Sequence, residues 1–314
     1  MEYNAQTTYR ELYKQGVECL QKAQIAEAEL DARLLLEWCC GTNRNTLLVH
    51  GERSISVEEF EKYVDTIGRR AQHIPLQHIT GEQEFMGLTF EVNEYVLIPR
   101  QDTEILVEEA MRHLHDGMKV LDMCTGSGCI LLSILHYSND CVGVGVDISE
   151  KALNVAKRNA KRMKALKENL QVSFLQSNLF EAFENQLSDG MDAQFDMDAQ
   201  FDMDAQFDVD ARFDMIVSNP PYIRSDVIQT LMPEVKEHEP ILALDGKEDG
   251  LYFYRNIIKN AGKYLTGGGK LFFEIGYDQG KDVKRLMEQE GYKEVEVIKD
   301  FAGLDRVVCG TLQK

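Results

Sequence analysis

The sequence predicts an α/β protein in which a small helical bundle and a β-hairpin precede a mostly parallel sheet with helices on both faces. Three changes of pattern along the chain predict it. Residues 8–73 have apolar side chains at helical spacing and no strand signal. Residues 84–93 change to a period of two, which is typical of a short hairpin. From residue 103 onward, strand and helix signals alternate, as they do in βαβ units.

The length of 314 residues favours two domains. We expect an all-α bundle at residues 1–79, a β-hairpin linker at 80–102 and an α/β domain at 103–314. A helical bundle by itself indicates no chemistry. We therefore look for the function in the α/β domain.

Local signals mark the ends of several elements. Gly41 supplies a helix stop in the bundle, and Ser56 with Glu59 forms a capping box at the start of the next helix. Gly87 is the expected turn of the hairpin. The α/β domain is expected to hold strands at 118–123, 141–148, 170–176, 213–218 and 269–276 and near Val295 and Val307, with helices beginning at Thr103, Gly128, Glu150, Tyr252 and Gln279.

A six-residue unit is repeated in residues 191–214, which read MDAQFD, MDAQFD, MDAQFD and VDARFD. Because six is a multiple of the strand period, the repeat could form one long amphipathic strand. We favour the alternative, a duplication in a surface loop, since long insertions there cost little closure entropy. The last copy runs into the next strand, where Phe213, Met215 and Val217 are expected to share one face.

The charge of the chain argues against nucleic acid as a partner. A formal net charge of −19 would repel a phosphate backbone. The densest basic run, residues 157–167, spreads its charges around a helix and is expected to be a solvated face. We expect no stable binding of nucleic acid.

The cysteines and the apolar pattern indicate a reduced, cytoplasmic protein. The seven cysteines are an odd number and show neither CxxC pairs nor the His/Cys spacing of a zinc site, so we expect no metal. No apolar run reaches the ~20 residues of a membrane span. The acidic start lacks the regions of a signal peptide, so we expect no membrane association.

A cofactor site is indicated by the stretch VLDMCTGSGCI at residues 120–130. It combines a strand, a glycine-bearing turn and a helix start, whose free backbone N–H groups suit a ligand. Asp147 ends the next strand, where an acidic side chain can accept hydrogen bonds from both hydroxyls of a ribose. NAD and S-adenosylmethionine (SAM) both fit, and the missing third glycine of GxGxxG favours SAM. The alternative for Asp122 and Asp147 is a helix cap or a solvated strand end.

The strand FDMIVS runs into the sequence NPPY at residues 219–222. Pro220 and Pro221 end the strand and lock the backbone just after Asn219, because proline cannot donate to a sheet ladder. This strand is expected beside the first of the series, so its tip would face the cofactor. There the side-chain oxygen of Asn219 and the carbonyl of Pro220 can each accept one N–H of a conjugated amino group, with Tyr222 stacked over it. The alternative is a plain strand-ending turn.

These motifs resemble the HemK/PrmC family, the protein-(glutamine N5) methyltransferases that modify peptide chain release factors. The resemblance extends through nearly the whole chain. LLLEWCCG resembles the N-terminal helical domain of the family, and residues 75–104 resemble its linker and the segment that closes over SAM. HEPILALDGKEDGL, at residues 238–251, is similar to a later signature. NPPY by itself is shared with adenine-N6 methyltransferases, whereas LIPRQDTE and EPILALDGKEDGL are much more specific.

The resemblance implies a Rossmann-like class I SAM-dependent methyltransferase domain with a mostly parallel seven-stranded sheet. SAM would be the methyl donor, and the glutamine of a release factor's Gly-Gly-Gln motif the acceptor. The bundle would recognise the release factor, and we expect a monomer. By resemblance, the amide clamp is Asn219, Pro220, Pro221 and Tyr222. The cofactor contacts in the glycine loop are Cys124, Thr125, Gly126, Ser127 and Gly128. The other cofactor contacts are Asp147 at the ribose, Asn178 near the adenine, Arg100 and Thr103 near the methionine end, and Leu179 and Asn219.

Two residues depart from the family pattern. Cys124 stands where many members carry glycine, and we expect an ordinary backbone conformation there. Asn178 stands where an aspartate is common, but its oxygen can still accept a hydrogen bond from an adenine amino group.

Two other functions are alternatives. An adenine-N6 methyltransferase acting on DNA or RNA would use the same clamp, but it needs basic residues to hold a flipped base. A non-catalytic protein with a SAM fold is the other alternative, and the intact Asn219 and glycine loop argue against it. The sequence does not indicate which release factors or other proteins are modified, or what the repeat contributes.

Overall fold

The computed structural model describes residues 7–188 and 212–313. The chain divides into two compact units, one formed by Met1–Glu82 with Met232–His238 and the other by Gln83–Leu231 with Glu239–Lys314. The chain therefore leaves the second unit after residue 231 and returns to it at residue 239. Most of the hexapeptide repeat lies outside the described residues. The functional boundaries expected at residues 79 and 102 stay a prediction.

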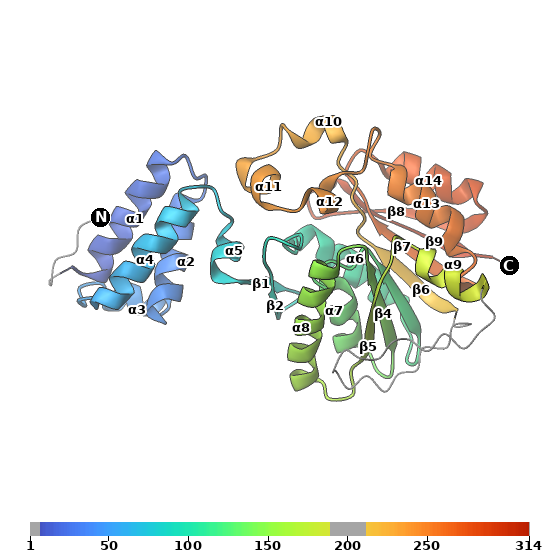
Figure 1. Cartoon of the computed structure of the whole chain (residues 1–314), viewed down its shortest axis with the longest axis horizontal. Coiled ribbons are helices and arrows are strands. Elements are labelled where there is room, and N and C mark those ends of the chain that lie inside the picture. The colour runs from blue at the N-terminus through green and yellow to red at the C-terminus, as the bar shows by residue number, and fades with distance from the viewer. Residues whose placement is uncertain (1–6, 189–211, 314) are drawn as a thin grey trace. The chain divides into compact units, whose positions relative to one another are not determined.

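The first unit is helical, as the 3.6-residue spacing predicts (Figure 1). The capping box of Ser56 and Glu59 is confirmed, with Ser56 N–H donating to Glu59 Oε2 over 2.8 Å. Gly41 ends its helix in the left-handed conformation, as expected. The buried core includes Leu12, Leu35 and Tyr63. The helices are α1 (Tyr9–Lys22), α2 (Ala28–Cys40), α3 (Arg44–Val49), α4 (Val57–Arg70), α5 (Leu76–Thr80) and α11 (Pro233–His238).

A buried ion cluster binds α11 to the other helices of this unit. The guanidinium of Arg70 donates to Asp31 Oδ2 over 2.7 Å and to Glu234 Oε1 over 2.5 Å. The side chain of Arg70 is only 7% exposed. Burial raises the pKa of Asp31, and the hydrogen bond from Arg70 opposes that shift. Arg70 therefore neutralises carboxylates that would be costly to bury alone.

We expect Arg70→Ala to lower the free energy of unfolding of this unit by about 3–5 kcal/mol, because it leaves buried carboxylates unpaired. Trp38 is the only tryptophan of the chain and lies in α2, so urea unfolding followed by its fluorescence reports on this unit. Arg69→Ala, at the neighbouring half-buried arginine, is the control and should cost less than about 1 kcal/mol. Equal urea midpoints for the two variants would contradict a stabilising role for the cluster.

The second unit begins with the predicted hairpin, formed by β1 (Glu82–Phe85) and β2 (Leu88–Glu91). Its turn residues Met86 and Gly87 have φ angles of 52° and 70°. Positive φ at both central residues is typical of a type I′ turn, which matches the twist of the two strands.

A seven-stranded sheet follows, in the order β5-β4-β3-β6-β7-β9-β8 (Figure 1). The first five strands in this order, β5, β4, β3, β6 and β7, are parallel to one another. β9 is antiparallel to both β7 and β8. The predicted mostly parallel sheet is thus confirmed. The strands are β3 (Lys119–Met123), β4 (Val142–Asp147), β5 (Gln171–Gln176), β6 (Phe213–Ser218), β7 (Leu265–Glu274), β8 (Tyr292–Lys299) and β9 (Asp305–Leu312).

Helices cover both faces of this sheet, as predicted. One buried cluster joins α6, α7 and α8 to one face, and a second joins α9, α13 and α14 to the other. Val120 belongs to the first cluster and Leu121 to the second. These neighbouring residues of one strand are both fully buried and point to opposite faces of the sheet. The helices are α6 (Gln101–Arg112), α7 (Cys129–Tyr137), α8 (Glu150–Leu166), α9 (Glu181–Ser188), α10 (Ser225–Ile228), α12 (Ile241–Leu244), α13 (Tyr252–Ala261) and α14 (Gly280–Gln289).

Two expectations about this unit are wrong. Phe213 does not share a core cluster with Met215 and Val217, and the pairing of β6 with β7 shifts register between Phe213 and Met215. The strand expected at 269–276 runs from Leu265 to Glu274, and its first residue pairs with Phe213 at the start of β6. Within the described residues, no helix is long and apolar enough to cross a membrane.

Candidate active site

The candidate site lies at the carboxyl edge of the parallel strands. β6 pairs with β3 and β3 with β4, so the segments after β3, β4 and β6 meet at one edge. The chain passes from β3 to β4 on one side and reaches β6 on the other side. This reversal of strand order is where open α/β sheets bind ligands. The structure thus brings the glycine loop, Asp147 and Asn219 to the same edge, as predicted.

The glycine loop runs from Cys124 to Gly128, between β3 and α7. Cys124, Gly126 and Gly128 have φ angles of 65°, 55° and 79°. The ordinary conformation expected for Cys124 is therefore wrong, because the sharp turn out of β3 requires a left-handed residue there. The Thr125 N–H donates to the Val146 carbonyl over 2.9 Å, which ties the loop to β4.

The left-handed backbone of Cys124 leads to a test of stability. Cys124→Gly relieves about 1–2 kcal/mol of strain but removes a partly buried thiol, so we expect unfolding free energy to change by less than about 1 kcal/mol. Cys129→Gly, the same substitution at the buried first residue of α7, should lower it by more than about 1 kcal/mol. Thermal denaturation compares the variants. An equal loss for both would contradict strain at Cys124.

Asp147 braces the glycine loop. Its Oδ2 accepts a hydrogen bond from the Gly126 N–H and its Oδ1 one from the Ser149 N–H, both over 2.9 Å. Burial raises the pKa of Asp147, and these backbone hydrogen bonds oppose the shift. Asp147 is not a helix cap, since Ser149 caps α8. Each carboxylate oxygen retains a lone pair for a further donor.

Asp122 lies under the same loop and is fully buried. Its Oδ2 accepts a hydrogen bond from the Thr125 hydroxyl over 2.6 Å. Its Oδ1 is buried and has no hydrogen-bond partner among the described residues. Burial raises the pKa of Asp122 to about 7. The alternative of a solvated strand end is therefore wrong for Asp122.

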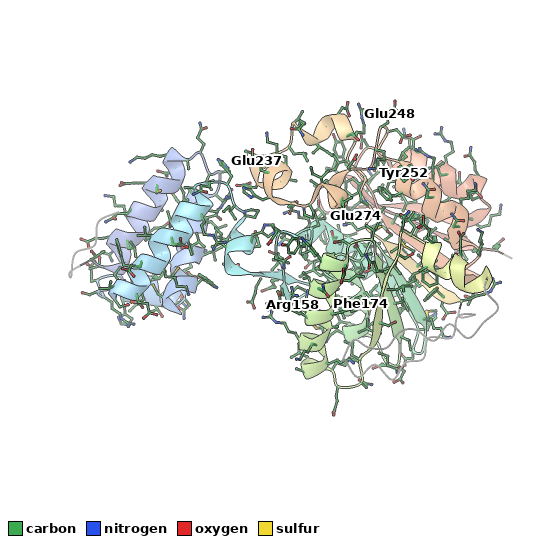
Figure 2. The ribbon with its side chains drawn as sticks, in the orientation of Figure 1. Arg158, Phe174, Glu237, Glu248, Tyr252 and Glu274 are labelled. Carbon is green, nitrogen blue, oxygen red and sulfur yellow. The ribbon has the colours of Figure 1, made fainter. Side chains whose placement is uncertain are left out.

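The Asn-Pro-Pro-Tyr turn follows β6 with both prolines buried. Asn219 is half-buried, and its Nδ2 donates to the Thr103 hydroxyl over 3.4 Å. Within the described part of the chain, the Asn219 Oδ1 has no hydrogen-bond partner. The Tyr222 hydroxyl donates to Glu274 Oε1 over 3.2 Å (Figure 2 labels Glu274). Stacking of Tyr222 over a substrate stays a prediction.

The other expected cofactor residues surround this edge. Thr103 is buried in α6 and contacts Asn219. Arg100 precedes α6, and its Nη2 donates to both carboxylate oxygens of the buried Glu239, over 2.7 and 2.8 Å. Asn178 is exposed after β5, and its Nδ2 donates to Glu181 over 2.6 Å, which leaves its oxygen available.

Leu179 and Ser127 complete the expected set. Leu179 follows Asn178 with a φ angle of 51°. The Ser177 N–H donates to the Asp147 carbonyl over 3.0 Å, so this segment is tied to the end of β4. Ser127 is buried, and its carbonyl accepts a hydrogen bond from the buried Asn159 of α8 over 2.9 Å. That bond links the glycine loop to a helix of the core.

Three residues that contact the expected site were not found from the sequence. Glu239 pairs with Arg100, and Glu274 and Gln279 both contact Tyr222. Glu239 lies in the quoted stretch HEPILALDG, so its signal was present. Glu274 and Gln279 lie at the end of β7 and just before α14, and only the neighbouring position of β7 and β6 reveals their role.

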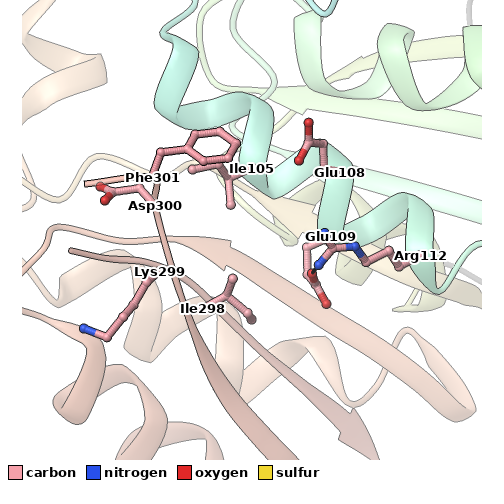
Figure 3. A pocket seen from close by; sticks show the side chains of 8 residues that line it. All are labelled: Ile105, Glu108, Glu109, Arg112, Ile298, Lys299, Asp300 and Phe301. Carbon is pink, nitrogen blue, oxygen red and sulfur yellow. Dashed lines mark hydrogen bonds and ion pairs between the residues drawn. The ribbon is translucent and has the colours of Figure 1, made fainter. Parts of the chain in front are cut away.

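A cavity elsewhere in the second unit is separate from this site (Figure 3). It shares no residue with the expected site, and Glu109 in its wall is already paired with Arg112. We assign it no function. Its lining consists of Ile105, Glu108, Glu109, Arg112, Ile298, Lys299, Asp300 and Phe301.

Two family models match the chain. A PrmC N-terminal domain matches residues 11–81, and a methyltransferase domain matches residues 114–274. The first match covers most of the helical bundle. The second spans the strands from β3 to β7, and with them the glycine loop, Asp147 and the Asn-Pro-Pro-Tyr turn.

Curated relatives match over nearly the whole length. A release factor glutamine methyltransferase of Clostridium botulinum is 40% identical over 304 residues, which cover 95% of this chain and 97% of the relative. One of Geobacter sulfurreducens is 38% identical and covers 93% of both chains. A solved release factor-specific protein-(glutamine-N5) methyltransferase of Alicyclobacillus acidocaldarius is 28% identical, with a TM-score of 0.39, 72% of this chain covered and 100% of that chain.

Proposed function

The chain belongs to the release factor glutamine methyltransferase family, and from this we propose that it methylates the side-chain amide nitrogen of a glutamine in a peptide chain release factor. The acceptor is the glutamine of the Gly-Gly-Gln motif, and the methyl donor is SAM. The observation that carries this proposal is the Asn-Pro-Pro-Tyr turn beside the glycine loop, with the Asn219 Oδ1 unpartnered.

The residues at the sheet edge fit SAM. SAM would supply an electrophilic methyl group on a positively charged sulfur, and the half-buried carboxylate of Asp147 gives this edge a negative potential. The unpartnered Oδ1 of Asp122 is free for a further donor. A Cβ at Gly126 would meet nothing within 4 Å, so space is open above the loop. Asp147 would hold the ribose hydroxyls, and Arg100, Thr103, Asn178 and Leu179 would line the remainder.

The Asn-Pro-Pro-Tyr turn would orient the acceptor amide. An amide nitrogen is a poor nucleophile because its lone pair is delocalised into the carbonyl. Asn219 Oδ1 would accept one of its N–H groups and the Pro220 carbonyl the other, which aims the nitrogen at the methyl carbon. Such orientation can lower a barrier by about 7–11 kcal/mol in the best cases. Bound SAM would supply the methyl group as an electrophile, and the two acceptors would hold the amide nitrogen in place while it loses one of its protons to solvent.

The remaining parts of the proposal concern recognition and location. The bundle at residues 1–79 would recognise the release factor, and residues 103–314 would carry the chemistry. The expected monomeric state, cytoplasmic location and lack of nucleic-acid binding stay predictions. The interpretation of the repeat as a duplication in a surface loop also stays a prediction.

The test is transfer of labelled methyl from SAM. Purified protein should label a release factor, and should not label the same release factor with the Gly-Gly-Gln glutamine replaced by alanine. DNA and ribosomal RNA serve as competing acceptors. Label on nucleic acid would indicate an adenine methyltransferase instead, and SAM binding without any transfer would indicate a non-catalytic protein.

A further inference from the structure

Two buried side chains, one at the end of β7 and one shortly after it, contact the last residue of the Asn-Pro-Pro-Tyr turn. We propose that Gln279 and Glu274 are positioning residues, which grip Tyr222 by its main chain and its side chain and thereby set the direction of Asn219. This inference rests on the proposed function, because it concerns the angle at which the turn presents its two acceptors. Among the described residues, both side chains hydrogen-bond to Tyr222 and not to Asn219, and Glu274 also interacts with Thr103.

The Gln279 amide is held in one orientation by four contacts. Its Nε2 donates to the Tyr222 carbonyl over 3.0 Å and to the Gly250 carbonyl over 3.3 Å. Its Oε1 accepts from the Gly276 N–H over 3.0 Å and from the Tyr254 hydroxyl over 3.4 Å. Acceptors on one side and donors on the other fix which atom is nitrogen. Gln279 is only 9% exposed, so losing any of these bonds leaves a buried polar group unpaired.

Two glycines let a second segment pack directly on the same backbone. A Cβ at Gly246 would lie 2.7 Å from both the Cα and the carbonyl carbon of Tyr222. A Cβ at Gly250 would lie 2.5 Å from the Tyr222 oxygen and 2.6 Å from Gln279 Nε2. Main-chain bonds complete this packing, with the Gly246 N–H donating to the Ile223 carbonyl over 2.8 Å. The exit of the turn is thus enclosed by backbone and by Gln279.

Glu274 holds the other end of Tyr222. It is the last residue of β7 and is 2% exposed. Its Oε1 accepts the Tyr222 hydroxyl, while its Oε2 is buried and unpartnered among the described residues. The carbonyl of Glu274 accepts the single proton of the Tyr254 hydroxyl over 2.9 Å, and the longer 3.4 Å contact to Gln279 Oε1 shares that proton, so the same tyrosine contacts both positioning residues.

Rigidity makes these contacts matter for Asn219. Pro220 and Pro221 have restricted φ angles, so the backbone between Asn219 and Tyr222 cannot easily absorb a displacement. A shift at the Tyr222 carbonyl is therefore carried to the Pro220 carbonyl and the Asn219 side chain. A misplacement of about 1 Å can lower a rate about 10²-fold.

Gln279→Glu tests the role of the Nε2 donor. At high pH the introduced carboxylate opposes the carbonyls of Tyr222 and Gly250, and when protonated it can donate to one of them. At about pH 8.5 we expect the kcat of Gln279→Glu to be at least tenfold below that of the parent. Near pH 6 the ratio of variant kcat to parent kcat should be at least threefold higher than at pH 8.5. The Kd for SAM should stay within threefold of the parent value. Gln279→Leu should lose a similar factor at every pH. The titratable or charged groups around this position are Glu274, Tyr222, Tyr254, Asp278, Arg306, Asp102 and Asp305.

Controls separate this effect from general titration and from misfolding. Gln289→Glu, at an exposed position of α14, should match the parent at both pH values. For Glu274, the isosteric Glu274→Gln keeps an acceptor for Tyr222 and should stay within threefold of the parent, whereas Glu274→Leu should lose at least tenfold in kcat. If Gln279→Glu does not fold, the two Glu274 variants decide.

A parent-like kcat for Gln279→Leu, or a pH-independent ratio for Gln279→Glu, would overturn the proposal. Equal losses for Glu274→Gln and Glu274→Leu would do the same. If the parent transfers no label to a release factor, the proposed function fails on its own. The inference is then decided by NMR, where the Asn219 side-chain amide signals of Gln279→Glu must differ from the parent at high pH and approach them at low pH.

Discussion

Asn219→Ala will lower kcat for release factor methylation by about 10²-fold or more, while the Kd for SAM stays within threefold. The substitution removes the Oδ1 that would accept one amide N–H, so the acceptor nitrogen is no longer aimed at the methyl group. Cofactor affinity should survive because the Asn219 side chain bonds only to Thr103 among the described residues, and the glycine loop and Asp147 are untouched. Steady-state kinetics with labelled SAM, together with calorimetric SAM binding, measure the two quantities.

Two further variants make this test specific. Asn219→Asp retains an oxygen acceptor and should recover part of the lost rate. Asn139→Ala, at an exposed loop position, should be indistinguishable from the parent. If Asn219→Ala turns over as fast as the parent, the amide clamp does not exist in this protein. A loss confined to SAM affinity would assign Asn219 to the cofactor alone.

Asp147→Asn will raise the Kd for SAM by about 10–100-fold and leave kcat at saturating SAM within a few-fold. In the parent, both carboxylate oxygens accept backbone N–H groups, from Gly126 and Ser149. The variant replaces one of these oxygens with an NH₂ donor, which opposes an N–H, and it weakens the acceptors available to the ribose. Hydrogen bonds to a charged group contribute about 1.5–3 kcal/mol each, which is about tenfold or more in affinity.

Calorimetric titration with SAM measures this effect. Asp140→Asn is the matched control, since Asp140 is exposed and its φ angle of 52° is one that asparagine tolerates. It should bind SAM as the parent does. An Asp147→Asn protein with parent-like affinity and a reduced kcat would place Asp147 in catalysis and contradict its assignment to the ribose.

Local sequence signals predicted the elements well because they depend on near neighbours in the chain. The capping box of Ser56 and Glu59, the Gly41 stop and the hairpin turn at Gly87 are each decided within a few residues. The alternation of strands and helices also predicted that β6 lies beside β3. That pairing brings Asn219 to the edge that carries the glycine loop.

The errors arose where the way in which elements join and pair decides the local conformation. The left-handed backbone of Cys124 follows from the turn between β3 and α7, which outweighs the preference of a side chain for negative φ. The face of Phe213 changes where the register between β6 and β7 shifts. A period of two in the sequence carries no information about such a shift.

The sequence by itself determined the α/β class, the glycine loop with Asp147, and the Asn-Pro-Pro-Tyr turn, because periodicity, glycine and proline act over short distances. Only the tertiary structure decided that α11 belongs with the N-terminal helices through Arg70, and that Glu274 and Gln279 hold Tyr222. These partners are separated along the chain by 164, 52 and 57 residues. Their meeting depends on strand order and packing, and neither can be read from a pattern of neighbouring residues.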